Sequence, residues 1–131
     1  FKMAKILLVG ADESLREMYQ TVLTANGFDT VLESSAKDGL DRLSDEFFPA
    51  CIIFLPREET LWFIIKVRQV PRVKISSVPI LAVAELSSGE NLSEYIETGA
   101  TKVISKFPAS GDRLVKELKS ILNIPRMVPG Q

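Results

Sequence analysis

The sequence predicts a doubly wound α/β domain, in which helices cover both faces of a five-stranded parallel sheet to make three α/β/α layers. Short apolar runs alternate along the chain with segments whose apolar residues recur at helical spacing. Glycine or proline separates many of these segments. Because such alternation requires a parallel sheet and crossovers are right-handed, few topologies remain. We expect the strand order 2-1-3-4-5.

Five apolar runs are the predicted strands. The first, residues 5–9, is too short for a helix and is followed by Gly10. The third, residues 51–55, is apolar throughout, which is typical of a parallel strand buried on both faces. The remaining strands are expected at residues 28–32, 79–84 and 103–105.

Helical periodicity and capping residues predict five helices. The first follows Ser14, a candidate N-cap, and ends at Asn26 and Gly27. The next three are expected at residues 36–44, 61–69 and 91–97. The last begins near Ser110 or Asp112, ends before Pro125 and has an inward apolar stripe formed by Leu114, Val115, Leu118, Ile121 and Leu122.

Length and charge limit the classes of protein to consider. The 131 residues suffice for one domain with a substantial core, which we expect over residues 1–124. Residues 125–131 contain two prolines and a glycine and read as the start of a linker or C-terminal tail. The net charge of −1 favours neither direct nucleic-acid binding nor a membrane surface. No apolar run approaches the roughly 18 residues of a membrane span.

Two residue counts bear on chemistry. The sequence has no histidine and one cysteine, Cys51. Ser-His-Asp and Cys-His nucleophile systems and ordinary zinc sites are therefore excluded. Because Cys51 lies in an apolar run and has no partner for an internal disulfide, we expect a reducing, cytoplasmic setting. We predict a protein that is not an enzyme and that binds no cofactor.

Several short features recur at the spacing of one signalling family. They are Arg16 early in the first helix, Gly27-Phe28 before the second strand, Pro49 before the third, Pro79 at the fourth, and Gly99-Ala100 before the fifth, whose end carries Lys106. With these features the chain, over residues 5–123, resembles the CheY-like receiver domains of bacterial two-component response regulators. The resemblance implies a phosphorelay signalling domain with the fold predicted above.

The resemblance also implies an aspartyl-phosphate switch at the strand ends. Receiver domains bind Mg²⁺ with an acidic pair, phosphorylate an aspartate, and hold the phosphoryl group with a hydroxyl residue and a lysine. In this sequence the acidic pair falls on Gly10 and Ala11, the phosphoacceptor on Leu55, the hydroxyl residue on Ala84 and the lysine on Lys106. Only Lys106 matches. We therefore predict a pseudo-receiver that is not phosphorylated and does not bind Mg²⁺.

Two further departures from the family pattern follow the third and fifth strands. The segment after the third strand is shorter than in the family, and residues 56–60 are expected to form this shortened loop. The aromatic residue of the fifth strand that reports phosphorylation is replaced by Val103. Both changes agree with a domain that has lost phosphorylation.

Lys106 has no phosphoryl group to hold if this interpretation is correct. The simpler hypothesis is a structural ion pair with Asp12 or Glu85 at the edge of the pocket. A site that binds an anion is the alternative.

Residues 61–65 are five large apolar residues in a row, more than one buried helix face can absorb. Trp62 either packs against the shortened loop or belongs to a partner surface. The candidate surface residues are Trp62, Phe63, Tyr95, Val103 and Arg113. The last three lie in the region through which receiver domains usually dimerise, so a homodimer is an alternative to a solvated face.

The function that we predict is signalling through protein–protein contacts, with a protein partner or a fused output domain. The alternative is a small-ligand sensor that uses the crevice formed by Leu55, Ala84 and the Trp62 helix. A flavodoxin-type cofactor binder is a weaker alternative, because the sequence has no phosphate-binding loop.

Overall fold

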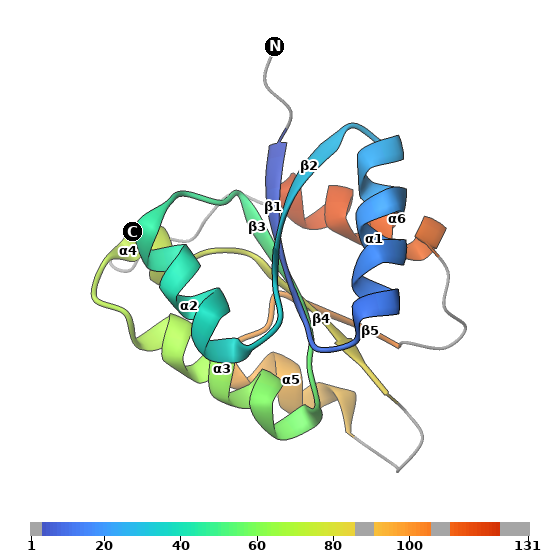
Figure 1. Cartoon of the computed structure of the whole chain (residues 1–131). Coiled ribbons are helices and arrows are strands. Elements are labelled where there is room, and N and C mark those ends of the chain that lie inside the picture. The colour runs from blue at the N-terminus through green and yellow to red at the C-terminus, as the bar shows by residue number, and fades with distance from the viewer. Residues whose placement is uncertain (1–3, 86–90, 106–110, 124–131) are drawn as a thin grey trace.

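The computed structural model describes residues 4–85, 91–105 and 111–123. Five parallel strands form one sheet in the order β2-β1-β3-β4-β5, which confirms the predicted order (Figure 1). They are β1 (Ala4–Gly10), β2 (Phe28–Glu33), β3 (Ala50–Phe54), β4 (Ile80–Ala84) and β5 (Lys102–Ser105). The predicted linker, residues 125–131, lies outside the described residues.

Helices cover both faces of this sheet (Figure 1). On one face lie α1 (Glu13–Ala25) and α6 (Gly111–Leu122), and on the other lie α2 (Ala36–Asp45), α3 (Arg57–Gln69), α4 (Val73–Ser76) and α5 (Leu92–Thr98). The three-layer α/β/α prediction is therefore confirmed. Helix α4 was not predicted, because four residues are too few to show helical periodicity. In the described ranges no helix is both long and apolar enough to cross a bilayer.

The capping residue predicted for the first helix is wrong. Asp12, and not Ser14, is the N-cap of α1, and its carboxylate accepts a hydrogen bond of 3.0 Å from the backbone N–H of Leu15. Asp12 is better placed because the carboxylate reaches the N–H three residues ahead. At the start of α6, Ser110 lies outside the described residues and Asp112 lies within the first turn.

The predicted loop after the third strand is also wrong. Helix α3 begins at Arg57, so residues 57–60 form its first turn. Glu58 and Glu59 stabilise this turn because carboxylates interact favourably with the positive end of a helix dipole. The Thr60 hydroxyl donates a buried hydrogen bond of 2.9 Å to the Leu55 carbonyl. The chain thus passes from β3 into α3 with almost no loop.

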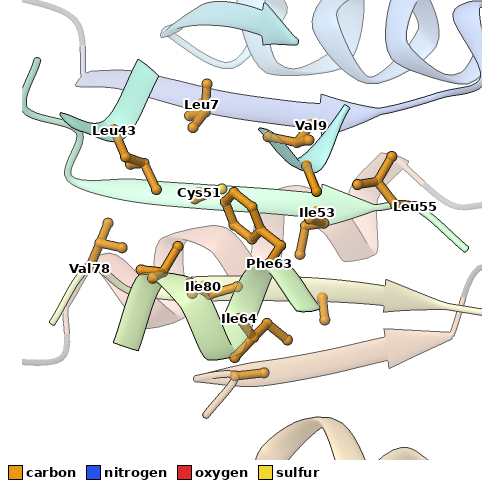
Figure 2. Packing of buried hydrophobic residues seen from close by; sticks show 14 of the residues in the cluster. Leu7, Val9, Leu43, Cys51, Ile53, Leu55, Phe63, Ile64, Val78 and Ile80 are labelled. Carbon is orange, nitrogen blue, oxygen red and sulfur yellow. The ribbon is translucent and has the colours of Figure 1, made fainter. Parts of the chain in front are cut away.

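The larger core cluster lies between the sheet and the layer of α2 and α3. Along β3, Cys51 and Ile53 point into this cluster, while Ile52 and Phe54 point to the opposite face toward α1 and α6. Phe63 of α3 is fully buried against β3 (Figure 2). Because both faces of β3 are covered, all five of its residues are buried.

Arg68 connects α3 to three neighbouring turns. Its guanidinium donates hydrogen bonds of 2.7 to 2.9 Å to the carbonyls of Ser76, Val78 and Gly99. These carbonyls belong to the end of α4, the segment before β4 and the end of α5. One half-buried side chain thus pairs backbone groups that helix and strand ladders leave unpaired.

Replacing Phe63 with alanine is expected to lower the free energy of unfolding by about 3–5 kcal/mol, because it leaves a cavity in the core. Trp62→Ala is a matched control on the same helix, since Trp62 is 41% exposed and Phe63 is fully buried. Urea unfolding followed by circular dichroism measures both. Equal losses for the two variants would contradict the helix orientation described above.

The Cys51 thiol is expected to resist alkylation in the folded protein. Cys51 is fully buried, and burial raises its pKa well above the ordinary value, an effect that the positive charge of Arg68 only partly offsets. Because the thiolate is the reactive form, iodoacetamide should label Cys51 only after unfolding. Mass spectrometry with and without denaturant checks this. Rapid labelling under native conditions would show that β3 is accessible.

Candidate functional site

The candidate site lies at the carboxyl ends of β1, β3 and β4. Strands β1 and β3 are neighbours, with Gly10 paired to Phe54, and β4 lies on the other side of β3. In the sheet, β1 lies between β2 and β3, so the chain changes direction across the sheet after β2. The site is therefore at the topological switch point, where open α/β sheets bind ligands. Gly10, Leu55 and Ala84 therefore lie at one edge of the sheet, as the sequence predicted.

The ring of Phe54 covers Gly10. A Cβ atom added at position 10 would lie 1.9 Å from Cε2 and 2.2 Å from Cζ of Phe54, far below a van der Waals contact. The ring is held in place by an edge-on contact with Tyr19, with 5.0 Å between ring centroids. Burial raises the pKa of the Tyr19 hydroxyl above its ordinary value, so this ring stays neutral. Phe54 thus occupies the space that a side chain at position 10 would need.

Phe54 was not among the residues predicted for the site. Its position next to Leu55 in sequence directs it to the opposite face of β3, where it meets Gly10 across the sheet. A bulky aromatic residue paired with a glycine in a neighbouring strand could have indicated that its ring covers the glycine. The strand register was needed to interpret it.

Leu55 and Ala84 are apolar and buried at the carboxyl ends of β3 and β4. The side chain of Leu55 packs in the cluster under α2 and α3, and its carbonyl accepts the Thr60 hydrogen bond. Neither side chain carries an oxygen or nitrogen. At these two strand ends the side chains contribute to the hydrophobic core and offer no group that could bind or react with a polar ligand.

A cleft of about 270 Å³ opens above these strand ends. Its lining includes an apolar set and a charged set: Leu15, Phe54, Leu55, Val83 and Tyr95, with Asp12, Arg57 and Glu85. Asp12 also caps α1 through its carboxylate. The cleft therefore has an apolar floor and a charged rim.

Arg57 and Glu94 form a two-point ion pair beside the cleft. Nε of Arg57 donates to Oε2 of Glu94 over 3.0 Å, and Nη2 donates to Oε1. The pair joins the first turn of α3 to the first turn of α5. Because 37 residues separate the two in sequence, helical spacing gave no indication of it. The guanidinium at the rim is thus already engaged by a carboxylate.

Lys106, with its predicted contacts to Asp12 or Glu85, lies outside the described residues, so this ion pair stays a prediction. Asp12 and Glu85 are exposed and both line the cleft. Within the part of the chain that is described, no three His, Cys, Asp or Glu side chains are grouped so that they could hold a metal ion.

The predicted partner surface is only partly exposed. The side chains of Phe63 and Tyr95 are at most 2% exposed and cannot contact a partner, so their assignment to that surface was wrong. Val103 is half-buried against the core, whereas Trp62 and Arg113 are exposed. The error has a simple cause, since the helical period turns Trp62 outward and Phe63 inward. Trp62 does not tuck fully against the preceding segment, although Lys66 lies 5.9 Å from its ring centroid.

We compared the sequence and the fold with those of known proteins. No family model matches the sequence. The Transcriptional regulatory protein CpxR homolog of Haemophilus influenzae is 26% identical over 123 residues, which cover 92% of this chain and 51% of that protein. The chain thus spans about half the length of this curated relative.

Solved structures of response regulators match this chain over nearly its whole length. The chemotaxis response regulator CheY4 of Vibrio cholerae has a TM-score of 0.80 and 25% identity, covering 92% of this chain and 99% of that one. A putative response regulator from Chloroflexus aurantiacus has a TM-score of 0.84 and 26% identity, covering 94% and 100%. This chain has the fold of CheY-like response regulator receiver domains and resembles them over nearly its whole length. Domains of this kind are typically signalling modules rather than enzymes.

A third structure has the same fold with a metal ion present. The receiver domain of the sensor histidine kinase PA1611 from Pseudomonas aeruginosa, with magnesium coordinated in its active site cleft, has a TM-score of 0.82. It is 16% identical, and the match covers 94% of this chain and 100% of that one, so this likeness concerns the fold.

Substitutions at positions 10 and 54 are expected to be coupled in their effect on stability. Gly10→Ala should lower the free energy of unfolding by about 1–3 kcal/mol because the new methyl group meets the Phe54 ring. In a Phe54→Val background the same substitution should cost less, because the ring is gone. Urea unfolding of the two single variants and the double variant measures the coupling.

The matched control for this pair is Phe48→Val. Phe48 is also buried but belongs to the cluster on the opposite face of the sheet. Gly10→Ala should therefore cost the same with or without Phe48→Val. Additive effects at positions 10 and 54 would contradict the packing described here.

Proposed function

We propose that this receiver domain signals without an aspartyl phosphate, through contacts with a protein partner or a fused output domain. The observation that carries the proposal is the side chain at the end of β3, Leu55, which has no atom that can accept a phosphoryl group. Covalent phosphorylation at this position needs a carboxylate nucleophile. No change of phosphodonor or pH supplies one.

The surroundings of Leu55 support the same proposal. Mg²⁺ binding needs carboxylate oxygens beside the acceptor, and the resemblance assigns those places to Gly10 and Ala11. A carboxylate at position 10 would also collide with the Phe54 ring. Magnesium binding is therefore not part of the proposed mechanism, in contrast to the PA1611 receiver domain, whose cleft holds that ion.

A buried lone cysteine and the absence of a carboxylate acceptor suit a cytoplasmic interaction module. Direct nucleic-acid binding would belong to an output domain, since the net charge of this chain is −1.

A small-ligand sensor is the second candidate, and the cleft favours it. An apolar floor formed by residues such as Leu15, Phe54 and Val83 would accommodate an apolar group, and the rim charges would orient a polar one. Native mass spectrometry of the purified protein separates the two proposals. A retained small molecule that is lost on Val83→Trp, a substitution that fills the cleft, would favour the sensor.

The decisive test of the first proposal is treatment with acetyl phosphate and Mg²⁺ followed by intact-mass measurement. We expect no increase by one phosphate. A variant with Gly10→Asp, Ala11→Asp, Phe54→Val and Leu55→Asp restores the acidic residues and removes the obstructing ring, so it is the matched comparison. Stoichiometric phosphorylation of the unsubstituted protein on any Asp residue would refute the proposal.

A further inference from the structure

The outward face of α3 carries an unusual pattern of exposed residues. Four residues spaced by four, three and four positions point away from the core and are all exposed: Glu58, Trp62, Ile65 and Gln69. The opposite face of the helix is buried by Thr60, Phe63, Ile64 and Val67. Spacing of this kind is that of one seam of a two-stranded coiled coil. We call these four residues, with the adjacent Glu59 and Lys66, the α3 face.

The centre of the α3 face is apolar. Trp62 and Ile65 are 41% and 43% exposed, although both are large apolar side chains. Helices α2 and α5 contact the flanks of α3, and Figure 1 shows α3 between them at the outside of the domain. The described part of the chain therefore leaves this apolar centre open to solvent.

The two ends of the α3 face carry opposite charges. Glu58 and Glu59 lie in the first turn, and Lys66 lies in the last turn. None of these three side chains is in an ion pair within the described residues. The charge pattern thus reverses from one end of the face to the other around an apolar centre.

We propose that the α3 face binds the α3 face of a second copy of this chain, with the two helices antiparallel. A two-fold interface must be self-complementary, so that when residue i contacts residue j, j also contacts i. With antiparallel helices, Trp62 of each copy packs against Ile65 of the other. Glu59 of each copy then lies opposite Lys66 of the other.

The register of these contacts is consistent along the helix. The midpoint between Trp62 and Ile65 and the midpoint between Glu59 and Lys66 are one residue apart, about 1.5 Å along the helix axis. Both kinds of contact can therefore form around one two-fold axis. In the heptad that the spacing defines, Glu59 and Lys66 both occupy the position after a seam residue, where antiparallel coiled coils form their flanking ion pairs.

A second copy fits this pattern better than an unrelated partner. A partner of a single charge would face like charge at one end of the helix, whereas a copy turned end to end faces opposite charge at both ends. The apolar area is small, since each copy contributes two large side chains. We expect a reversible dimer whose interface is below about 1,200 Å², the lower end for specific complexes. A fused output domain that holds two copies together would strengthen it.

This interface does not depend on the proposed loss of phosphorylation. Trp62, Ile65 and Lys66 do not line the cleft at the strand ends. Dimerisation is therefore measured by experiments that leave the cleft unchanged, and failure of either proposal leaves the other standing.

The first experiment uses Trp62 as a probe, because it is the only tryptophan of the chain. As the protein concentration rises, sedimentation velocity should show a dimer. Over the same range Trp62 emission should shift to shorter wavelength and iodide should quench it less, since the ring enters an apolar interface. Ile65→Ala should weaken the dimer by tenfold or more. A monomer at millimolar concentration, or a dimer that Ile65→Ala leaves unchanged, would overturn the proposal.

The second experiment tests the antiparallel register by charge reversal. In Glu59→Lys and in Lys66→Glu, both predicted ion pairs become like-charge contacts, and each variant alone should dimerise about tenfold more weakly. An equimolar mixture of the two variants should form a heterodimer at least as tight as the unsubstituted homodimer, because every contact is again attractive. A mixture no tighter than either variant would refute the register.

The double variant Glu59→Lys with Lys66→Glu is the matched control. It removes the Lys66 contact with the Trp62 ring but exchanges the charges, so its homodimer should persist. All three variants change exposed positions and should unfold at the same temperature as the unsubstituted protein. A dimer lost in the double variant would show that the Trp62 contact, and not the antiparallel ion pairs, was responsible.

Discussion

Burial of β3 on both faces is the constraint on which the rest of the structure depends. All five residues of β3 are buried, and its side chains alternate between two core clusters. A strand that is apolar on both faces is stable only between two layers of helices, which requires the crossovers of a doubly wound sheet. The same alternation directs Phe54 and Leu55 to opposite faces of the sheet. The end of β3 therefore supplies both the ring that covers Gly10 and part of the floor of the cleft.

At the carboxyl ends of β1, β3 and β4, the residues Gly10, Leu55 and Ala84 offer packing and no polar side chain. A phosphorylation site holds charges in a fixed arrangement and needs water, a metal ion and carboxylates. Here Phe54 contacts Tyr19 on one side and covers Gly10 on the other. Aromatic packing of this kind contributes stability through burial and edge-on ring contacts. The ion pair of Arg57 and Glu94 links the first turn of α3 to the first turn of α5.

Local patterns predicted the sheet and most of the helices, because apolar runs, helical periodicity and glycine or proline boundaries are properties of short segments. The strand order was predicted from the alternation of strands and helices together with the right-handed crossover rule. Tertiary relations were not predictable in this way. The contact of Phe54 with Gly10 needs the register of two strands, and the pairing of Arg57 with Glu94 needs the placement of two helices. Phe63 and Tyr95 were assigned to a partner surface because hydrophobicity alone does not give the direction in which a helix buries its side chains.

The hydrogen bonds of Arg68 have a consequence for how the domain opens. Helix α4 has four residues and α5 has seven, lengths that are not stable as isolated helices in water. A single guanidinium on α3 holds the carbonyls at the ends of both. Local unfolding of either short helix must therefore break contacts with α3. We therefore expect the two short helices to open together with α3 and not separately from it.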